Sequence, residues 1–268
     1  MPVSRMLKLS EIWVYPIKSM GGIRLASAKV VEKGLLHDRR WMLVDAENNF
    51  MTQRVHHQMA MFRLSFQPDG FLVNHHSDSI LLPFEGSLLP EPIHTKVWDD
   101  DVVVQEVSKE MSAWFSQQLG IACRLVQFPE NNPRPVEAQF RVSDDHVSLA
   151  DGYPFLIIGQ SSLDDLNNRL SERLPMDRFR PNLVFTGGQP YEEDAWRNFS
   201  IGSNRFVGVK PCSRCVLTTI NQQTGIAGKE PLATLATYRR KENKIYFGQN
   251  VIAIDHDEIF EGNEIVVE

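Results

Sequence analysis

Two cysteines three residues apart carry the most restrictive chemical signal in the chain. Cys212 and Cys215 belong to the segment KPCSRC, residues 210–215, which is followed by the β-branched run VLTTI at 216–220. A Cys-x-x-Cys pair can form a redox dithiol, supply half of a zinc site, provide a thiolate to another metal, or consist of two small buried side chains.

The first two of these roles fit the surrounding sequence poorly. A thioredoxin-like dithiol places its first cysteine at a helix N-terminus, where the dipole lowers the thiol pKa, whereas the composition of 216–220 predicts a strand. Structural zinc takes four ligands, and the one remaining cysteine, Cys123, has no partner at metal-binding spacing. The adjacent pairs His56-His57 and His75-His76 point to opposite faces of a strand and rarely bind one metal.

Positive charge favours a more reactive role for the pair. Lys210 and Arg214 are close in sequence to the two thiols, and nearby cations favour thiolate over thiol. A thiolate is a soft ligand that suits a heavy metal already held by sulfur donors, and a single protein thiolate leaves other coordination positions open. The residues alone leave this reading and that of two buried structural thiols both open.

The elements that must position these cysteines are mostly strands. In the first half we expect strands at 7–15, 26–32, 41–46, 61–66, 80–84, 94–98 and 102–107, separated by turn signals such as Pro68-Asp69-Gly70 and Asp99 to Asp101. In the second half we expect strands at 155–158, 183–186, 205–210, 216–220, 246–254 and 264–267. Many short strands at this spacing favour barrels or curled sheets.

Helices are fewer, and a proline-rich segment divides the chain. We expect a helix at 109–119 between the N-cap Ser108 and Gly120, a second begun by a Ser161–Asp164 capping box that continues to Leu174, and a third beginning at Pro231. The segment PENNPRP at 129–135 predicts a boundary. The fold class is therefore mainly β with added helices (α+β), with an N-terminal β-barrel-like domain at 1–128 and a C-terminal domain at 129–268.

Composition excludes several classes of protein. The chain of 268 residues has a net charge of −6, so no broad basic field attracts nucleic acid or anionic lipid. No apolar run approaches the roughly 18–20 residues that cross a bilayer, and residues 1–16 lack the features of a signal peptide. Three cysteines are too few for a secreted disulfide framework. We expect a cytoplasmic protein that binds neither nucleic acid nor membrane.

Six motifs in a fixed order extend over almost the whole chain: YPIKS at 15–19, Gly34 with DRRW at 38–41, DGYPF at 151–155, FRPN at 179–182, the cysteine segment 210–219, and FGQN at 247–250. In these motifs the chain resembles the MOSC family, in the two-domain branch with an N-terminal β-barrel. This branch includes the mitochondrial amidoxime-reducing component and bacterial hydroxylaminopurine reductases. The resemblance implies that residues 129–268 form the MOSC β-barrel domain, which binds the molybdenum cofactor, and that Cys215 ligates molybdenum as the catalytic residue, with Cys212 as a neighbour.

The resemblance also assigns a cofactor cleft between the two domains. Its implied lining residues are Lys18, Ser19, Arg39, Asp151, Arg180, Ser213, Arg214 and Asn250. The cationic members suit a molybdenum-molybdopterin cofactor, because the pterin carries a phosphate that guanidinium groups bind through paired hydrogen bonds. The five tryptophans are expected in the core rather than at the site, and the acidic run 192–194 is expected to be a solvated loop face.

The implied activity is reduction of N-hydroxylated compounds, such as hydroxylamines, amidoximes or N-hydroxylated bases, to amines or amidines. Some bacterial relatives continue into a ferredoxin-type domain, and this chain has no cysteine cluster for one, so we expect electrons from a separate flavoprotein or iron-sulfur protein. The membrane anchor of the mitochondrial relatives is also missing, which favours a soluble bacterial-style protein. The alternative is a carrier or storage protein that binds the cofactor without turnover, and a simple dithiol switch is a third reading.

Overall fold

The second half of the chain is organised around a closed β-barrel. The computed structural model describes residues 6–86 and 88–268, so residues 1–5 of the N-terminal segment discussed above lie outside the described residues. Seven strands of the described chain follow one another around this barrel: β12 (Phe155–Gly159), β13 (Leu183–Thr186), β1 (Leu7–Val14), β19 (Glu264–Val267), β14 (Asn198–Ile201), β15 (Asn204–Ser213) and β17 (Lys244–Ala253). Pairing between β12 and β17 closes the ring.

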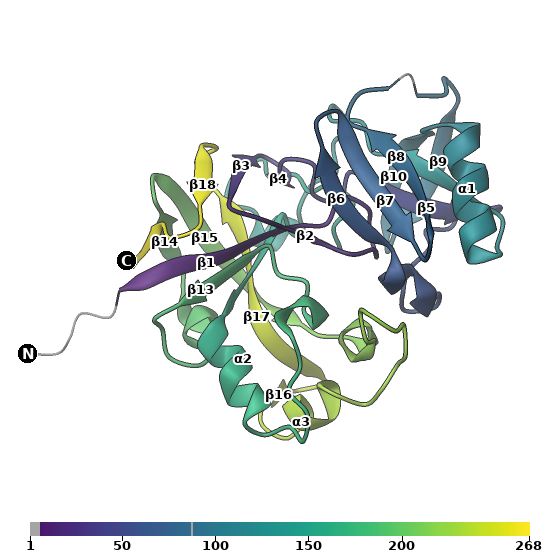
Figure 1. The fold of residues 1–268 in the computed structure, drawn as a ribbon. Coiled ribbons are helices and arrows are strands. Elements are labelled where there is room, and N and C mark those ends of the chain that lie inside the picture. Colours follow the sequence, from purple (N-terminus) through teal and green to yellow (C-terminus); the bar gives the residue numbers. More distant parts are fainter. Residues whose placement is uncertain (1–5, 87) are drawn as a thin grey trace, which may run out of the picture.

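Strand β1 contributes to this barrel from the far end of the sequence. It is hydrogen-bonded to β13 and β19, although residues 7–14 fall in the segment predicted as the N-terminal domain. In Figure 1 the purple β1 runs through the green and yellow strands of the second half. The domain division near residue 128 stays a prediction. Strand β1 precedes that division in the sequence but belongs to the barrel of the second half.

The first half forms smaller sheets around a second core. One sheet contains β5 (Trp41–Asp45), β11 (Cys123–Gln127), β10 (Asp100–Glu106) and β9 (Pro92–Val97); another contains β6 (Arg63–Gln67), β7 (Gly70–His75) and β8 (Asp78–Pro83). One cluster that includes Trp41, Phe62 and Phe71 joins β5 and β11 to the second sheet, while β9 and β10 pack in a separate cluster that includes Val97 and Val104. The remaining strands are β2 (Ile23–Leu25), β3 (Ser27–Val31), β4 (Gly34–Leu35), β16 (Arg240–Lys241) and β18 (Glu258–Phe260).

Three α-helices of the described chain flank the sheets: α1 (Lys109–Leu119), α2 (Gln160–Asn167) and α3 (Leu232–Ala236). The α1 prediction is confirmed in detail, since the Ser108 hydroxyl accepts a hydrogen bond from the Met111 amide and Gly120 ends the helix in a left-handed conformation. Short 3₁₀ turns complete the chain: η1 (His57–Met61), η2 (Ala138–Phe140), η3 (Met176–Arg178), η4 (Glu192–Ala195) and η5 (Val216–Thr219). No helix of the described residues is long and apolar enough to cross a membrane.

The prediction for the second helix was wrong in both its cap and its length. The N-cap of α2 is Gly159, with no capping side chain, and the Ser161 hydroxyl is buried with no hydrogen-bond partner among the described residues. The helix ends at Asn167, whose side chain bonds both the amide and the carbonyl of Leu174. Those two bonds hold the chain in a turn where the leucine spacing favoured further helix.

Two expectations about the second half also require correction. Residues 216–219 form the 3₁₀ turn η5 rather than a strand, because the Thr218 amide and hydroxyl both donate to the Cys215 carbonyl. The acidic run 192–194 is not a solvated face: Glu193 is buried, accepting hydrogen bonds from the Gly159 amide and the Ser162 hydroxyl. Asp194 is paired with Arg239.

Candidate functional site

A cavity of about 470 Å³ brings together all nine site residues that the resemblance implies. Its lining includes Lys18, Ser19, Arg39, Asp151, Arg180, Ser213, Arg214, Cys215 and Asn250. Lys18, Ser19 and Arg39 come from the segments between β1 and β5, while the others come from the second half of the chain. These residues are separated by as many as 232 positions in the sequence, from 18 to 250, and the fold gathers them into one site.

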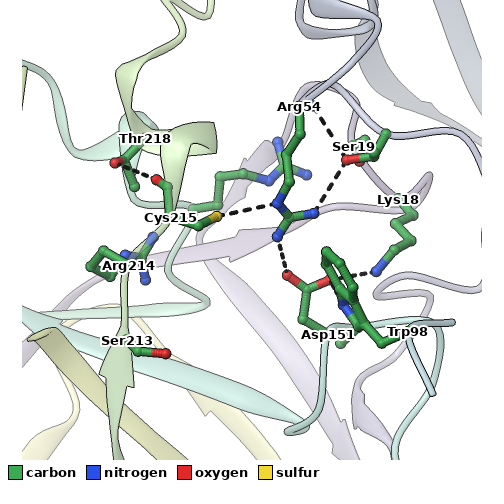
Figure 2. Close-up of polar contacts among 12 residues, drawn as sticks. Lys18, Ser19, Arg54, Trp98, Asp151, Ser213, Arg214, Cys215 and Thr218 are labelled. Carbon is green, nitrogen blue, oxygen red and sulfur yellow. Dashed lines mark hydrogen bonds and ion pairs between the residues drawn. The ribbon is translucent and has the colours of Figure 1, made fainter. Parts of the chain in front are cut away.

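The Cys215 sulfur is exposed in this cavity at the junction of β15 and η5. Its backbone is extended and caps η5, and the Thr218 contacts described above fix its carbonyl. The Nε of Arg54 lies 3.2 Å from this sulfur. Figure 2 shows Arg54 reaching across the cavity between Cys215 and Asp151. The sulfur is therefore held by a cation from the first half of the chain.

The cations nearest the thiols match the expectation only for Arg214. Arg54, which no motif includes, contacts Cys215, whereas Arg214 donates to the sulfur of Cys212 at 3.0 Å. The ammonium of Lys210 pairs with Glu137 at 3.1 Å and lies over the Phe140 ring. Nothing in the local sequence marks Arg54, because it is an ordinary charged residue in the turn that precedes η1.

Asp151 is the centre of a charged network on one wall. Lys18 lies 2.6 Å from one carboxylate oxygen, and Arg54 lies 2.8 Å from the other. Removal from bulk water raises the pKa of Asp151, but the two adjacent cations outweigh that effect and hold it well below its usual range. Burial lowers the pKa of Lys18 to about 8, although Asp151 opposes the shift. The carboxylate thus remains ionised and fixes both cations at the cavity wall.

A second cationic group consists of Arg39 and Arg180, which line the cavity and contact the ring of Tyr15. The guanidinium groups of Arg39 and Arg180 lie 4.4 Å and 4.2 Å from the centre of the Tyr15 ring. Arg39 is oriented by Asp38 at 2.6 Å and by the side chain of Asn182 at 3.1 Å. Burial lowers the pKa of Arg180 to about 10. Two guanidinium groups held this closely favour an anionic ligand.

Backbone strain is concentrated at the same place. Nine non-glycine residues of the described chain have a positive φ, and four of them line the cavity: Ser19, Arg39, Trp98 and Arg180. Such conformations cost free energy outside glycine and tend to occur where function requires a particular side-chain position. The backbone conformations of these four residues indicate that the chain holds their side chains in position at the cavity.

Trp98 was expected in the core, and this expectation was wrong. Its indole lines the cavity with 46% of its surface exposed, and its N–H donates to Asp151 at 3.2 Å. The sequence did contain a signal, because Trp98 directly precedes the acidic turn Asp99 to Asp101, where a large aromatic side chain is out of place. Trp41 and Trp196, by contrast, are buried as expected.

Comparison with known proteins gives matches over both halves of the chain. A model of the MOSC domain matches residues 144–266, and a model of the MOSC N-terminal beta barrel domain matches residues 6–122. Mitochondrial amidoxime-reducing component 1 of Mus musculus is 34% identical over 242 residues, which cover 86% of this chain and 71% of that protein. The Homo sapiens protein of the same name is 32% identical over 90% of this chain and 77% of its own length.

A second group of relatives is considerably longer. Molybdenum cofactor sulfurase of Oryza sativa subsp. japonica is 31% identical over 282 residues, which cover 97% of this chain and 34% of the sulfurase. The chain therefore spans about a third of that relative. The amidoxime-reducing components have the same two-domain arrangement as this chain.

Proposed function

The chain belongs to the MOSC family, in the branch with a MOSC N-terminal beta barrel domain, and from this membership we propose that it is a molybdenum-cofactor-dependent reductase of N-hydroxylated compounds. A function related to the molybdenum cofactor is supported by both groups of relatives, the amidoxime-reducing components and the cofactor sulfurases. The amidoxime-reducing components, which the chain covers over most of their length, favour the reductase. Its substrates would be hydroxylamines, amidoximes or N-hydroxylated bases.

The observation that supports this proposal most is the convergence of the motif residues around one exposed sulfur. Cys215 presents its thiol to a cavity of about 470 Å³, whose walls carry the side chains of Lys18, Arg39, Arg54 and Arg180. A soft sulfur ligand beside clustered cations suits a metal attached to an anionic organic molecule.

Further features of the cavity fit such a cofactor. The buried Arg180 guanidinium, whose pKa burial lowers, gains stability from an anion beside it. The Nε of Arg214 is buried and has no acceptor among the described residues, so it has a donor available for a ligand. We assign the metal to Cys215, and the anionic and polar groups of the pterin to Lys18, Ser19, Arg39, Asp151, Arg180, Ser213, Arg214 and Asn250.

The bound cofactor supplies a two-electron redox centre for cleavage of the N–O bond. The balanced change consumes two electrons and two protons and converts an N-hydroxy group to N–H plus water. The chain orients the sulfur through Arg54 and Thr218, neutralises the anionic ligand, and leaves space beside Cys215 for the substrate. We propose that the electrons come from a separate flavoprotein or iron-sulfur protein.

The test is to purify the protein from a host that makes the cofactor, measure bound molybdenum, and assay benzamidoxime reduction with reduced viologen. We expect stoichiometric metal and turnover in the wild type, loss of both in Cys215→Ala, and a much milder effect of Cys212→Ala. Metal without turnover would support a cofactor carrier instead. Equal losses from the two cysteine variants would support a dithiol.

A further inference from the structure

Trp98 occupies a backbone position that suits its side chain poorly. It is the first residue of the turn between β9, which ends at Val97, and β10, which begins at Asp100. Its φ is +59°. Glycine or asparagine adopts this left-handed conformation at lower cost, and tight hairpin turns normally contain them. A bulky aromatic residue held there points to a role for the ring itself.

Several contacts keep the indole in place at the cavity wall. Its N–H donates to Asp151 Oδ1 at 3.2 Å, the Arg54 guanidinium lies 4.6 Å from the ring, and Phe50 packs against it edge-on at 5.4 Å. Nevertheless 46% of the residue surface stays exposed. The ring is thus immobilised before any ligand arrives, which lowers the entropic cost of binding against it.

The indole is also close to the reactive sulfur. The same Arg54 guanidinium that packs on Trp98 contacts Cys215 at 3.2 Å, so one guanidinium group separates the ring from the sulfur. Figure 2 shows Trp98 beside Asp151 on the wall that faces Cys215 across Arg54. A substrate whose N-hydroxy group lay next to Cys215 would have its remaining atoms within reach of this wall.

From this arrangement we propose that Trp98 determines substrate specificity by packing against the flat apolar body of the substrate, so that N-hydroxylated compounds with an aryl group are preferred over those with a small alkyl group. The inference rests on the proposed function. It extends that function by naming the preferred class of substrate. An aromatic ring that packs on an exposed indole gains binding free energy that a methyl group does not provide.

The test compares benzamidoxime with acetamidoxime, which have the same reacting group and differ in phenyl against methyl. The ratio of their kcat/KM values cancels any loss of metal or of electron supply. We expect the ratio to fall roughly three- to tenfold in Trp98→Ala, and to recover partly in Trp98→Phe. In Trp98→Gly we expect the same fall without a lower unfolding midpoint, because glycine relieves the positive φ.

Trp114→Phe is the matched control. Trp114 also donates its indole N–H to an aspartate, Asp78 at 3.1 Å, but it lies on α1 outside the cavity lining, so its replacement leaves the ratio unchanged. An unchanged ratio in metal-loaded Trp98→Ala would overturn the inference. If the wild type reduces neither amidoxime, the proposed function fails. The aryl preference is then tested separately by calorimetric titration of both compounds into the metal-loaded proteins. Equal affinities in wild type and Trp98→Ala would refute it.

Discussion

Arg54 joins both halves of the molecule through a single guanidinium group. Its three nitrogens donate to Cys215 Sγ at 3.2 Å, Thr52 Oγ1 at 3.2 Å and Asp151 Oδ2 at 2.8 Å. Burial lowers the pKa of Arg54, but Asp151 and Cys215 outweigh that effect and raise it above its usual value. The planar fork can satisfy three acceptors at once, which a lysine ammonium on a flexible stem does less well.

We therefore expect Arg54→Ala to weaken retention of the cofactor by roughly ten- to hundredfold, because a hydrogen bond to a charged group contributes about 1.5–3 kcal/mol. Arg54→Lys should recover part of the loss. The measurement is the molybdenum that remains on the protein after graded dialysis. Arg169→Ala, which removes an exposed ion pair with Asp165 away from the cavity lining, is the control. Retention of metal by Arg54→Ala at the wild-type level would remove Arg54 from the site.

The motifs predicted the members of the site better than they predicted its contacts. All nine predicted residues line the cavity, because they belong to short motifs that the resemblance places around one cofactor. Arg54 and Trp98 were missed because neither belongs to a motif: nothing in the local sequence marks Arg54, and the placement of Trp98 before an acidic turn was not used. Their roles, and those of the nine, remain proposals that the variants above test.

At the scale of elements, strand periodicity located most of the longer strands of the first half, β1, β3, β5, β6, β8, β9 and β10. It missed β7 and β11, as well as the shorter β2, β4, β14, β16 and β18. Gly70 was taken only as a turn residue, although it also begins β7. The Val216–Thr219 segment has the composition of a strand, but the local bonds of Thr218 to Cys215 produce a 3₁₀ turn. Strand propensity gives the wrong answer there, because side-chain hydrogen bonds to the backbone offer an alternative to pairing with a neighbouring strand.

The buried carboxylate of η4 gives a test at this scale. Burial raises the pKa of Glu193 from 4.5 to about 7, against the opposing hydrogen bonds from Gly159 and Ser162. The neighbouring Asp194 adds to the rise. Because the folded state binds the Glu193 proton more tightly than the unfolded state, this group's contribution to stability is fully present below about pH 4.5. It is lost as the pH rises towards 7.

Glu193→Gln removes this titration and keeps an oxygen that can accept from Gly159 and Ser162. We expect the free energy of unfolding of the variant, relative to wild type, to increase between pH 4.5 and pH 7 by up to about 3 kcal/mol, and to change little above that range. Urea unfolding at several pH values measures the difference, and titrations shared by both proteins cancel. A difference that is the same at pH 5 and pH 8 would show that Glu193 does not titrate in this window.

At the scale of the whole molecule, no local sequence pattern could predict which strands of the two halves pair with each other. Strand β1 completes the barrel by pairing Lys8 with Thr186, 178 positions away. The cavity depends on such long-range pairing, because Lys18 and Ser19 lie four and five residues after the end of β1 at Val14. Closure of the barrel through β1 therefore also positions Lys18 and Ser19 at the candidate site.

A chain of buried amides links the same segment to the loop that follows η5. Gln53 donates to the Ser19 carbonyl at 2.8 Å, and Gln222 donates to the Gln53 side-chain oxygen at 2.9 Å and to the Ile220 carbonyl at 3.0 Å. Both glutamines are buried. Each single removal deprives one carbonyl, that of Ser19 or Ile220, of its donor and also leaves the remaining glutamine without its amide partner. The loss of the Gln53–Gln222 bond is common to both single variants, so it counts only once in the double variant.

This predicts strong coupling between Gln53→Leu and Gln222→Leu. Each single variant should lose about 1–3 kcal/mol of unfolding free energy, and the double variant should lose less than the sum by roughly 0.5–3 kcal/mol. Urea unfolding of the four proteins completes the cycle. A parallel cycle on the exposed Arg205–Asp255 pair, which joins two segments of the second half, should show weaker coupling. Additive losses at Gln53 and Gln222 would mean that this amide pair does not couple the two halves, and that Ser19 is positioned without it.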